Sequence, residues 1–83
     1  MKLLYFAWVR QKIGIGEEEL ALPAGVKDVA ALIDALRKRG AGYAEALGDL
    51  SRLRCAVNQQ HVDFNARIGA DDEVAFFPPV TGG

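Results

Sequence analysis

One segment alone has the apolar spacing of a substantial helix, and it lies among several short apolar runs. Its apolar residues recur three and four positions apart, at Val29, Leu32, Ile33 and Leu36, which is the spacing of one helical face. Asp28 precedes them and is a good N-cap, because its carboxylate can accept hydrogen bonds from free amides of the first turn. Gly40 is a natural residue at the helix end, and residues 43–47 suit one further turn. This single main helix has to cover one face of a sheet.

The remaining apolar runs are short and are typical of strands. The predicted strands are residues 3–9, 17–22, 53–57, 61–62 and 73–77, each rich in apolar residues or alternating between apolar and polar ones. The first two flank a short turn marked by glycines and should pair antiparallel. A helix laid across a mixed sheet of four or five strands is the β-grasp, or ubiquitin-like, arrangement of the α+β class. We predict a β-grasp domain over residues 1–77 and an extended arm over residues 78–83.

Composition excludes several classes of protein. A chain of 83 residues makes one domain, and its net charge of −1 argues against nucleic-acid binding, which needs a strong basic patch. Cys55 is the single cysteine, so we expect a buried thiol rather than a disulfide or a metal site. His61 has no catalytic partner in the sequence, and residues 71–73 are typical of a solvated acidic turn. The first apolar run is too short for a membrane span, which favours a cytoplasmic protein.

One face of the predicted strand 3–9 carries charges at both ends, Lys2 and Arg10, and this indicates the outward face. The large apolar residues expected on that surface are Leu4, Phe6, Trp8 and, from the last strand, Phe77. Small monomeric proteins seldom expose several such residues together without a partner. We therefore predict a docking surface. The alternatives are that the face assignment is inverted or that a loop covers the patch.

The chain ends in Gly82-Gly83, a pair without side chains whose backbone can enter a narrow channel. Pro78 and Pro79 stiffen the approach, because each fixes its own φ and pushes the preceding residue toward extended geometry. Residues 78–83 reach at most about 20 Å, at roughly 3.3–3.6 Å each. We interpret this segment as a stiff arm that presents a carboxyl group, with the chemistry at its tip.

Three segments resemble the sulfur-carrying small subunits of molybdopterin synthase, a family of ubiquitin-like β-grasp proteins. They are Leu4-Tyr5-Phe6-Ala7-x-Val9-Arg10, Ala56-Val57-Asn58-Gln59 and the tail from Asp72 to Gly83. The tail is the most specific of the three, since other carriers with this fold share little beyond the two glycines. The resemblance covers most of the chain, and Trp8 and His61 stand at variable positions inside matched segments.

The resemblance implies a role in molybdenum cofactor biosynthesis. An adenylylating partner consumes ATP at Gly83, and a sulfur donor protein then converts the terminal carboxylate into a thiocarboxylate. The carrier docks on the large synthase subunit, in a heterotetramer of two small and two large chains, and gives sulfur to cyclic pyranopterin monophosphate. The implied arm residues are Pro78, Pro79, Val80, Thr81 and Gly82, with Phe77 and Phe6 as docking residues. No metal and no tightly bound cofactor is implied.

In such a family the chain is a sulfur-donating subunit of an enzyme whose active site lies mainly on the large subunit, so whether it counts as an enzyme itself stays open. Three other functions remain. The first is a sulfur carrier for thiamine synthesis or tRNA thiolation, and the second is a ubiquitin-like protein modifier. The third is an interaction module with an inert terminus.

Overall fold

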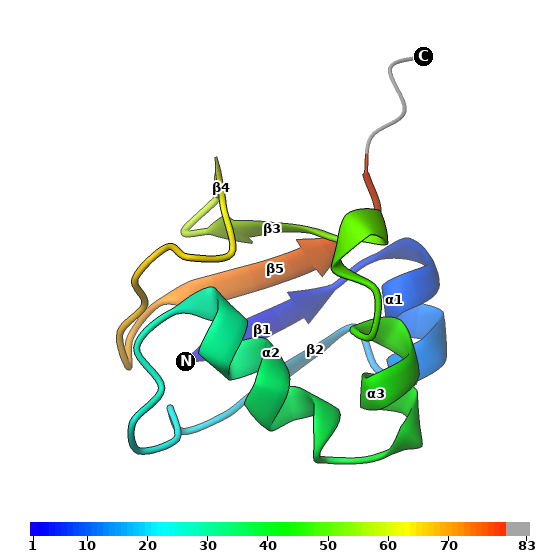
Figure 1. Cartoon of the computed structure of the whole chain (residues 1–83), viewed down its shortest axis with the longest axis horizontal. Coiled ribbons are helices and arrows are strands. Elements are labelled where there is room, and N and C mark those ends of the chain that lie inside the picture. Colours follow the sequence, from blue (N-terminus) through cyan, green and yellow to red (C-terminus); the bar gives the residue numbers. More distant parts are fainter. Residues whose placement is uncertain (80–83) are drawn as a thin grey trace.

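The computed structural model describes residues 1–79; the predicted arm residues Val80, Thr81, Gly82 and Gly83 lie outside this range. In chain order the elements are β1 (Lys2–Tyr5), α1 (Ala7–Ile13), β2 (Glu17–Glu19), α2 (Val29–Arg37), α3 (Ala41–Ala46), the 3-10 helix η1 (Leu50–Arg52), β3 (Arg54–Val57), β4 (Gln60–Val62) and β5 (Glu73–Phe77) (Figure 1).

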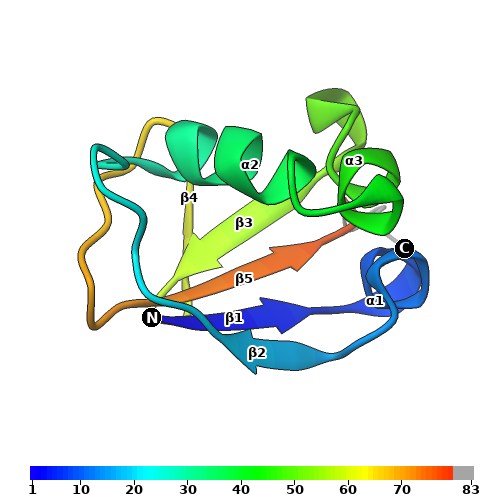
Figure 2. The same ribbon diagram turned by 90° about the horizontal axis from the view of Figure 1, so that it is seen from below.

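The strands form one five-stranded sheet in the order β2-β1-β5-β3-β4. The two central strands, β1 and β5, are parallel, while the pairs β1–β2, β3–β5 and β3–β4 are antiparallel. Helices α2 and α3 lie on one side of this sheet, as Figure 2 shows. A mixed sheet with a main helix across one face confirms the predicted β-grasp fold.

Helix α2 forms where its apolar spacing predicted it. The Asp28 carboxylate accepts a hydrogen bond of 2.8 Å from the Ala31 amide, so the predicted N-cap is confirmed. The residues that face the sheet are fully buried: Val29, Leu32, Ile33 and Leu36. The predicted role of Gly40 is wrong, because Lys38 caps the end of α2 and Gly40 is instead the N-cap of α3.

The predicted strand over residues 3–9 is wrong in its second half. Strand β1 ends at Tyr5, and α1 begins at Ala7 with a positive φ of 53°. The chain turns at Phe6, whose carbonyl accepts hydrogen bonds from the Val9 and Arg10 amides, at 3.1 and 3.4 Å. The helix also buries Val9, and its contacts with α3 supply packing that an extended strand would lack.

The second predicted strand is shorter than expected. It covers only Glu17–Glu19, although Leu20 and Leu22 pack against the core as the sequence indicated. Glu18 points to the helix side and accepts hydrogen bonds from the hydroxyl groups of Tyr5 and Tyr43, at 2.8 and 2.7 Å. This contact ties the edge of the sheet to α3.

Candidate docking surface

The sheet face opposite α2 carries a row of small and apolar side chains. Residues that pair across strands share a face, and the register aligns Glu17, Leu4, Ala75, Ala56 and His61 across all five strands. The inner face, with Leu3 and Tyr5, packs under the helices. The centre of the outer face is therefore apolar, between an acidic end and a histidine.

Two large side chains stand out from this face. Phe6 is 48% exposed and Ile15 is 42% exposed, the two large hydrophobic residues of the described chain that are most open to water. Both line a shallow depression with Leu4. Ala75 of β5 pairs with Leu4 on the same face and is itself buried, and Phe77 is the next residue of β5 on that face. We call this set of residues the docking face: Leu4, Phe6, Ile15, Ala75 and Phe77. Exposed large apolar residues gathered on one face indicate a partner-binding site.

The structure places three of the four residues expected on the outward surface there: Leu4, Phe6 and Phe77. Trp8 is not among them, because α1 turns it away and its half-buried ring lies 5.5 Å from the guanidinium carbon of Arg52. Sequence reasoning missed Ile15. The available signal was a large apolar residue between two glycines in a turn, where neither a helix nor a strand explains it.

The arm starts from β5, a central strand that is paired with a neighbouring strand on both sides. Strand β5 pairs with β1 on one side and with β3 on the other, and both ladders reach its last residues. Phe77 is half-buried and contacts His61, with 5.1 Å between ring centroids. Pro78 and Pro79 follow, also half-buried, and Figure 1 shows this end of β5 beside α1. The direction in which the arm leaves is therefore fixed by the sheet.

Cys55 is a buried residue rather than a reactive one. Its thiol donates a hydrogen bond of 3.3 Å to the Val62 carbonyl. Burial, with a smaller contribution from Asp63, raises the pKa of this thiol to about 11, so the less nucleophilic protonated form prevails at neutral pH. Over residues 1–79 no three histidine, cysteine or acidic side chains gather in a way that could hold a metal ion. None of the helices in this range is long and apolar enough to cross a bilayer.

Comparison with known proteins gives consistent matches over almost the whole chain. Residues 3–83 match the ThiS family. The molybdopterin synthase sulfur carrier subunit of Escherichia coli K12 is 43% identical over 83 residues, which is 100% of this chain and 99% of that protein. The subunit of the same name from Haemophilus influenzae is 34% identical, again over 100% of this chain and 99% of that protein.

Solved structures show the same fold. SAMP1 from Haloferax volcanii superposes with a TM-score of 0.72 at 27% identity, covering 100% of this chain and 98% of that one. A putative molybdopterin converting factor, subunit 1, from Pyrococcus furiosus gives a TM-score of 0.68 at 28% identity, with 95% of each chain covered.

Proposed function

The chain belongs to the ThiS family, and from this premise we propose that it is the sulfur carrier subunit of molybdopterin synthase. The observation that carries the proposal is the full-length similarity to sulfur carrier subunits of that synthase. The docking face next to the base of the arm supports it, because a carrier has to bind partners while its tip reacts in them. We place this activity in the cytoplasm.

The chemistry proposed for Gly83 needs activation by a partner. An α-carboxyl group has a pKa near 3.3–3.7 and is ionised at pH 7, which makes it a poor electrophile. ATP converts it into an acyl-adenylate with release of pyrophosphate, and sulfur from a donor protein then displaces AMP. The product is a thiocarboxylate at Gly83, whose sulfur is a good nucleophile toward cyclic pyranopterin monophosphate. Successive transfers of this kind build the dithiolene of molybdopterin.

The chain's own contribution is to position the tip. Phe77 and Phe6 hold the docking face against the large synthase subunit, and the segment from Pro78 to Gly82 enters its active site. Holding two reacting groups in a productive orientation supplies much of the rate of such a transfer. In this proposal two carriers bind two large subunits. The carrier holds no cofactor tightly, and the acid–base groups for the reaction come from the partners.

Intact mass spectrometry tests the proposal. The protein is incubated with an adenylylating enzyme, ATP and a sulfur donor, and then with the large subunit and cyclic pyranopterin monophosphate. We expect a species in which one oxygen is exchanged for sulfur, mapped to the C-terminal peptide, and molybdopterin as the final product. A variant that lacks Gly83 should give neither. An unmodified mass under all conditions would support an inert interaction module, and a covalent ladder on other proteins would support a protein modifier.

A further inference from the structure

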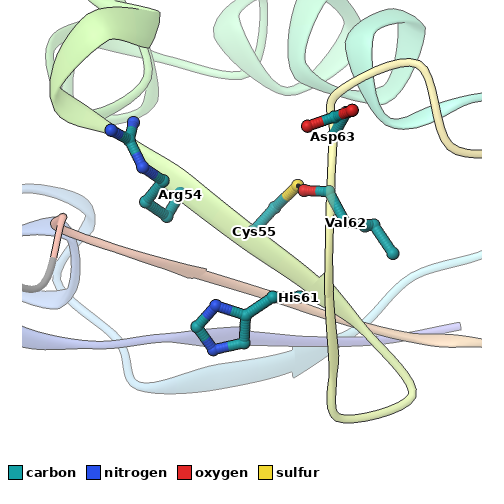
Figure 3. Close-up of a pocket in the computed structure, with 5 residues that line it drawn as sticks. All are labelled: Arg54, Cys55, His61, Val62 and Asp63. Carbon is teal, nitrogen blue, oxygen red and sulfur yellow. Dashed lines mark hydrogen bonds between the residues drawn. The ribbon is translucent and has the colours of Figure 1, made fainter.

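A small pocket lies beside the docking face, at the edge of the sheet where β4 is shorter than β3. Strand β4 pairs with β3 only from Cys55 to Val57, so Arg54 extends past its end. The pocket has a volume of about 300 Å³ and is lined by Arg54, Cys55, His61, Val62 and Asp63 (Figure 3). Nothing in the proposed sulfur chemistry uses these side chains.

Arg54 places a positive charge next to Phe77, one of the two predicted docking residues. It pairs with Phe77 across β3 and β5, and one guanidinium nitrogen donates to the Leu53 carbonyl at 2.8 Å. That bond orients the side chain and leaves further N–H donors of the guanidinium free. Within residues 1–79 no carboxylate lies within 4 Å of the Arg54 guanidinium, whereas ion pairs hold Lys2, Lys12, Arg37 and Arg39.

The two sides of the pocket carry opposite charges, from Arg54 and from Asp63. Figure 3 shows the Arg54 guanidinium and the Asp63 carboxylate on opposite sides of the Cys55 thiol, and the His61 ring across β3 from Cys55 and Asp63. His61 contacts Phe77 and its imidazole can donate a further hydrogen bond. The side with Arg54 and His61 is therefore the side nearer the docking face, and it suits an anion.

We propose that this pocket receives an aspartate or glutamate side chain of the large synthase subunit, bound by Arg54 and oriented away from Asp63. The inference rests on the proposed function and adds a charged contact to an otherwise apolar interface. Guanidinium groups bind carboxylates through two parallel hydrogen bonds, and Phe77 would shield this pair from water in the complex. Such a contact fixes the orientation of the carrier and accelerates association.

The length of the arm argues for a protein carboxylate rather than a phosphate of the activating nucleotide. The arm begins beside the pocket, and its reacting tip can lie about 20 Å away when residues 78–83 are extended. Phosphates that react at Gly83 are then out of reach of Arg54. The surface that covers the pocket is the rim of the partner's channel.

The test measures binding of the purified large subunit by calorimetry. At about 50 mM salt Arg54→Glu should weaken binding by at least about tenfold, while Asp63→Asn should strengthen it by about two- to threefold. At 1 M salt, where screening acts over about 3 Å, the loss from Arg54→Glu should shrink to less than about threefold and the gain from Asp63→Asn should vanish. Arg67→Glu and Asp71→Asn make the same charge changes at exposed positions outside the pocket and should each change binding by less than about twofold.

Arg54→Glu should weaken binding and Asp63→Asn should strengthen it, and these opposite effects distinguish a specific contact from damage to the fold. Melting curves confirm that each variant is folded, and Arg54→Gln, which removes the charge without reversing it, should give a smaller loss than Arg54→Glu. Equal binding by wild type and Arg54→Glu, or an equal loss in Arg67→Glu, would overturn the inference and leave the proposed function standing. Failure of the wild type to bind the large subunit would instead contradict the proposed function, and with it the partner named here.

Discussion

Glu18 is the acidic side chain with the most extensive set of hydrogen bonds in the described chain, and its side chain is only 13% exposed. Besides the two tyrosine hydroxyls it accepts a bond of 2.9 Å from Arg39. Partial burial acts to raise the pKa of its carboxyl, but the bonds from Tyr43, Tyr5 and Arg39 outweigh that effect and lower the pKa. Burial, followed by the bond to Glu18, raises the pKa of Tyr5, so the hydroxyl remains a donor.

This cluster predicts a loss of stability in acid. The folded-state pKa of Glu18 is lower than its unfolded value of about 4.3, so its contribution is complete above that value and is lost as the pH falls through the folded pKa. Glu18→Gln should lower the free energy of unfolding by about 1–2 kcal/mol at pH 7, and the difference from wild type should shrink below about pH 4. Melting temperatures measured from pH 7 to pH 3 check this. Glu19→Gln, an exposed neighbour on the same strand, should show no such trend.

Phe76 and Phe77 are adjacent, but β5 sends their side chains to opposite faces. Phe76 is fully buried, whereas Phe77 is half-buried on the docking face. Phe77→Ala should weaken binding to the large subunit by tenfold or more and lower the melting temperature by only a few degrees. Phe76→Ala should cost about 3–5 kcal/mol of folding free energy. Binding assays and thermal melts on both variants test these expectations. A large stability loss in Phe77→Ala would place that residue in the core instead.

Residue patterns in the sequence predicted local features correctly, but they could not predict contacts between residues that are distant in the sequence. The Asp28 cap and the buried face of α2 could be predicted because their partners are close in sequence. The Glu18 cluster could not, since its tyrosine partners are 13 and 25 residues away. The pocket at Arg54 was missed for the same reason, because it depends on where a short neighbouring strand ends.

Helix α1 is the element that was predicted wrongly from the sequence. A tertiary contact makes this segment helical. Residues 6–9 contain aromatic and β-branched side chains that suit a strand, and Phe6 offers no capping side chain. The helix forms because α3 packs against it, with Gly42 so close to the Lys12 carbonyl that a Cβ atom there would clash. Lys12 and Glu45 add an ion pair of 3.4 Å between the two helices.

Gly42→Ala tests that packing. In an exposed helix this change would stabilise the protein by up to about 1 kcal/mol, but here the new methyl group meets backbone that has to move. We expect a net loss of about 1–3 kcal/mol in the free energy of unfolding, measured by chemical denaturation. Gly69→Ala is the matched control, because the nearest atom to its added Cβ is 3.8 Å away and little should change. A stabilised Gly42→Ala variant would contradict the packing argument.

At the scale of the whole molecule, the order of elements was enough to predict the fold. One main helix and several short strands in 83 residues leave few arrangements in which both the helix and the sheet bury an apolar face. An uncovered apolar face was predicted separately, from the charges at both ends of one strand face, Lys2 and Arg10. Its composition was predicted only in part, because Ile15 joins it from a turn and Trp8 leaves it with α1.

A truncated chain that ends at Pro79 should separate docking from sulfur transfer. The core and the docking face lie within residues 1–79, so the fragment should fold and bind the large subunit, although more weakly than the full chain. Added to a synthase assay in excess over the thiocarboxylated carrier, it should reduce the rate of molybdopterin formation by competition. Inhibition that persists when Phe77 is also replaced by alanine would show that the fragment acts elsewhere.

The position of β5 also has a mechanical consequence. This strand is held through four residue pairs with β1 and four with β3, and the arm continues from its end. A pull along the arm, as when a spent tail is withdrawn from a partner's channel, would load both ladders in shear, so that many hydrogen bonds resist together. An edge strand such as β4 could be peeled away one bond at a time. A pull on the arm should therefore unfold the domain less readily than the same pull on an edge strand.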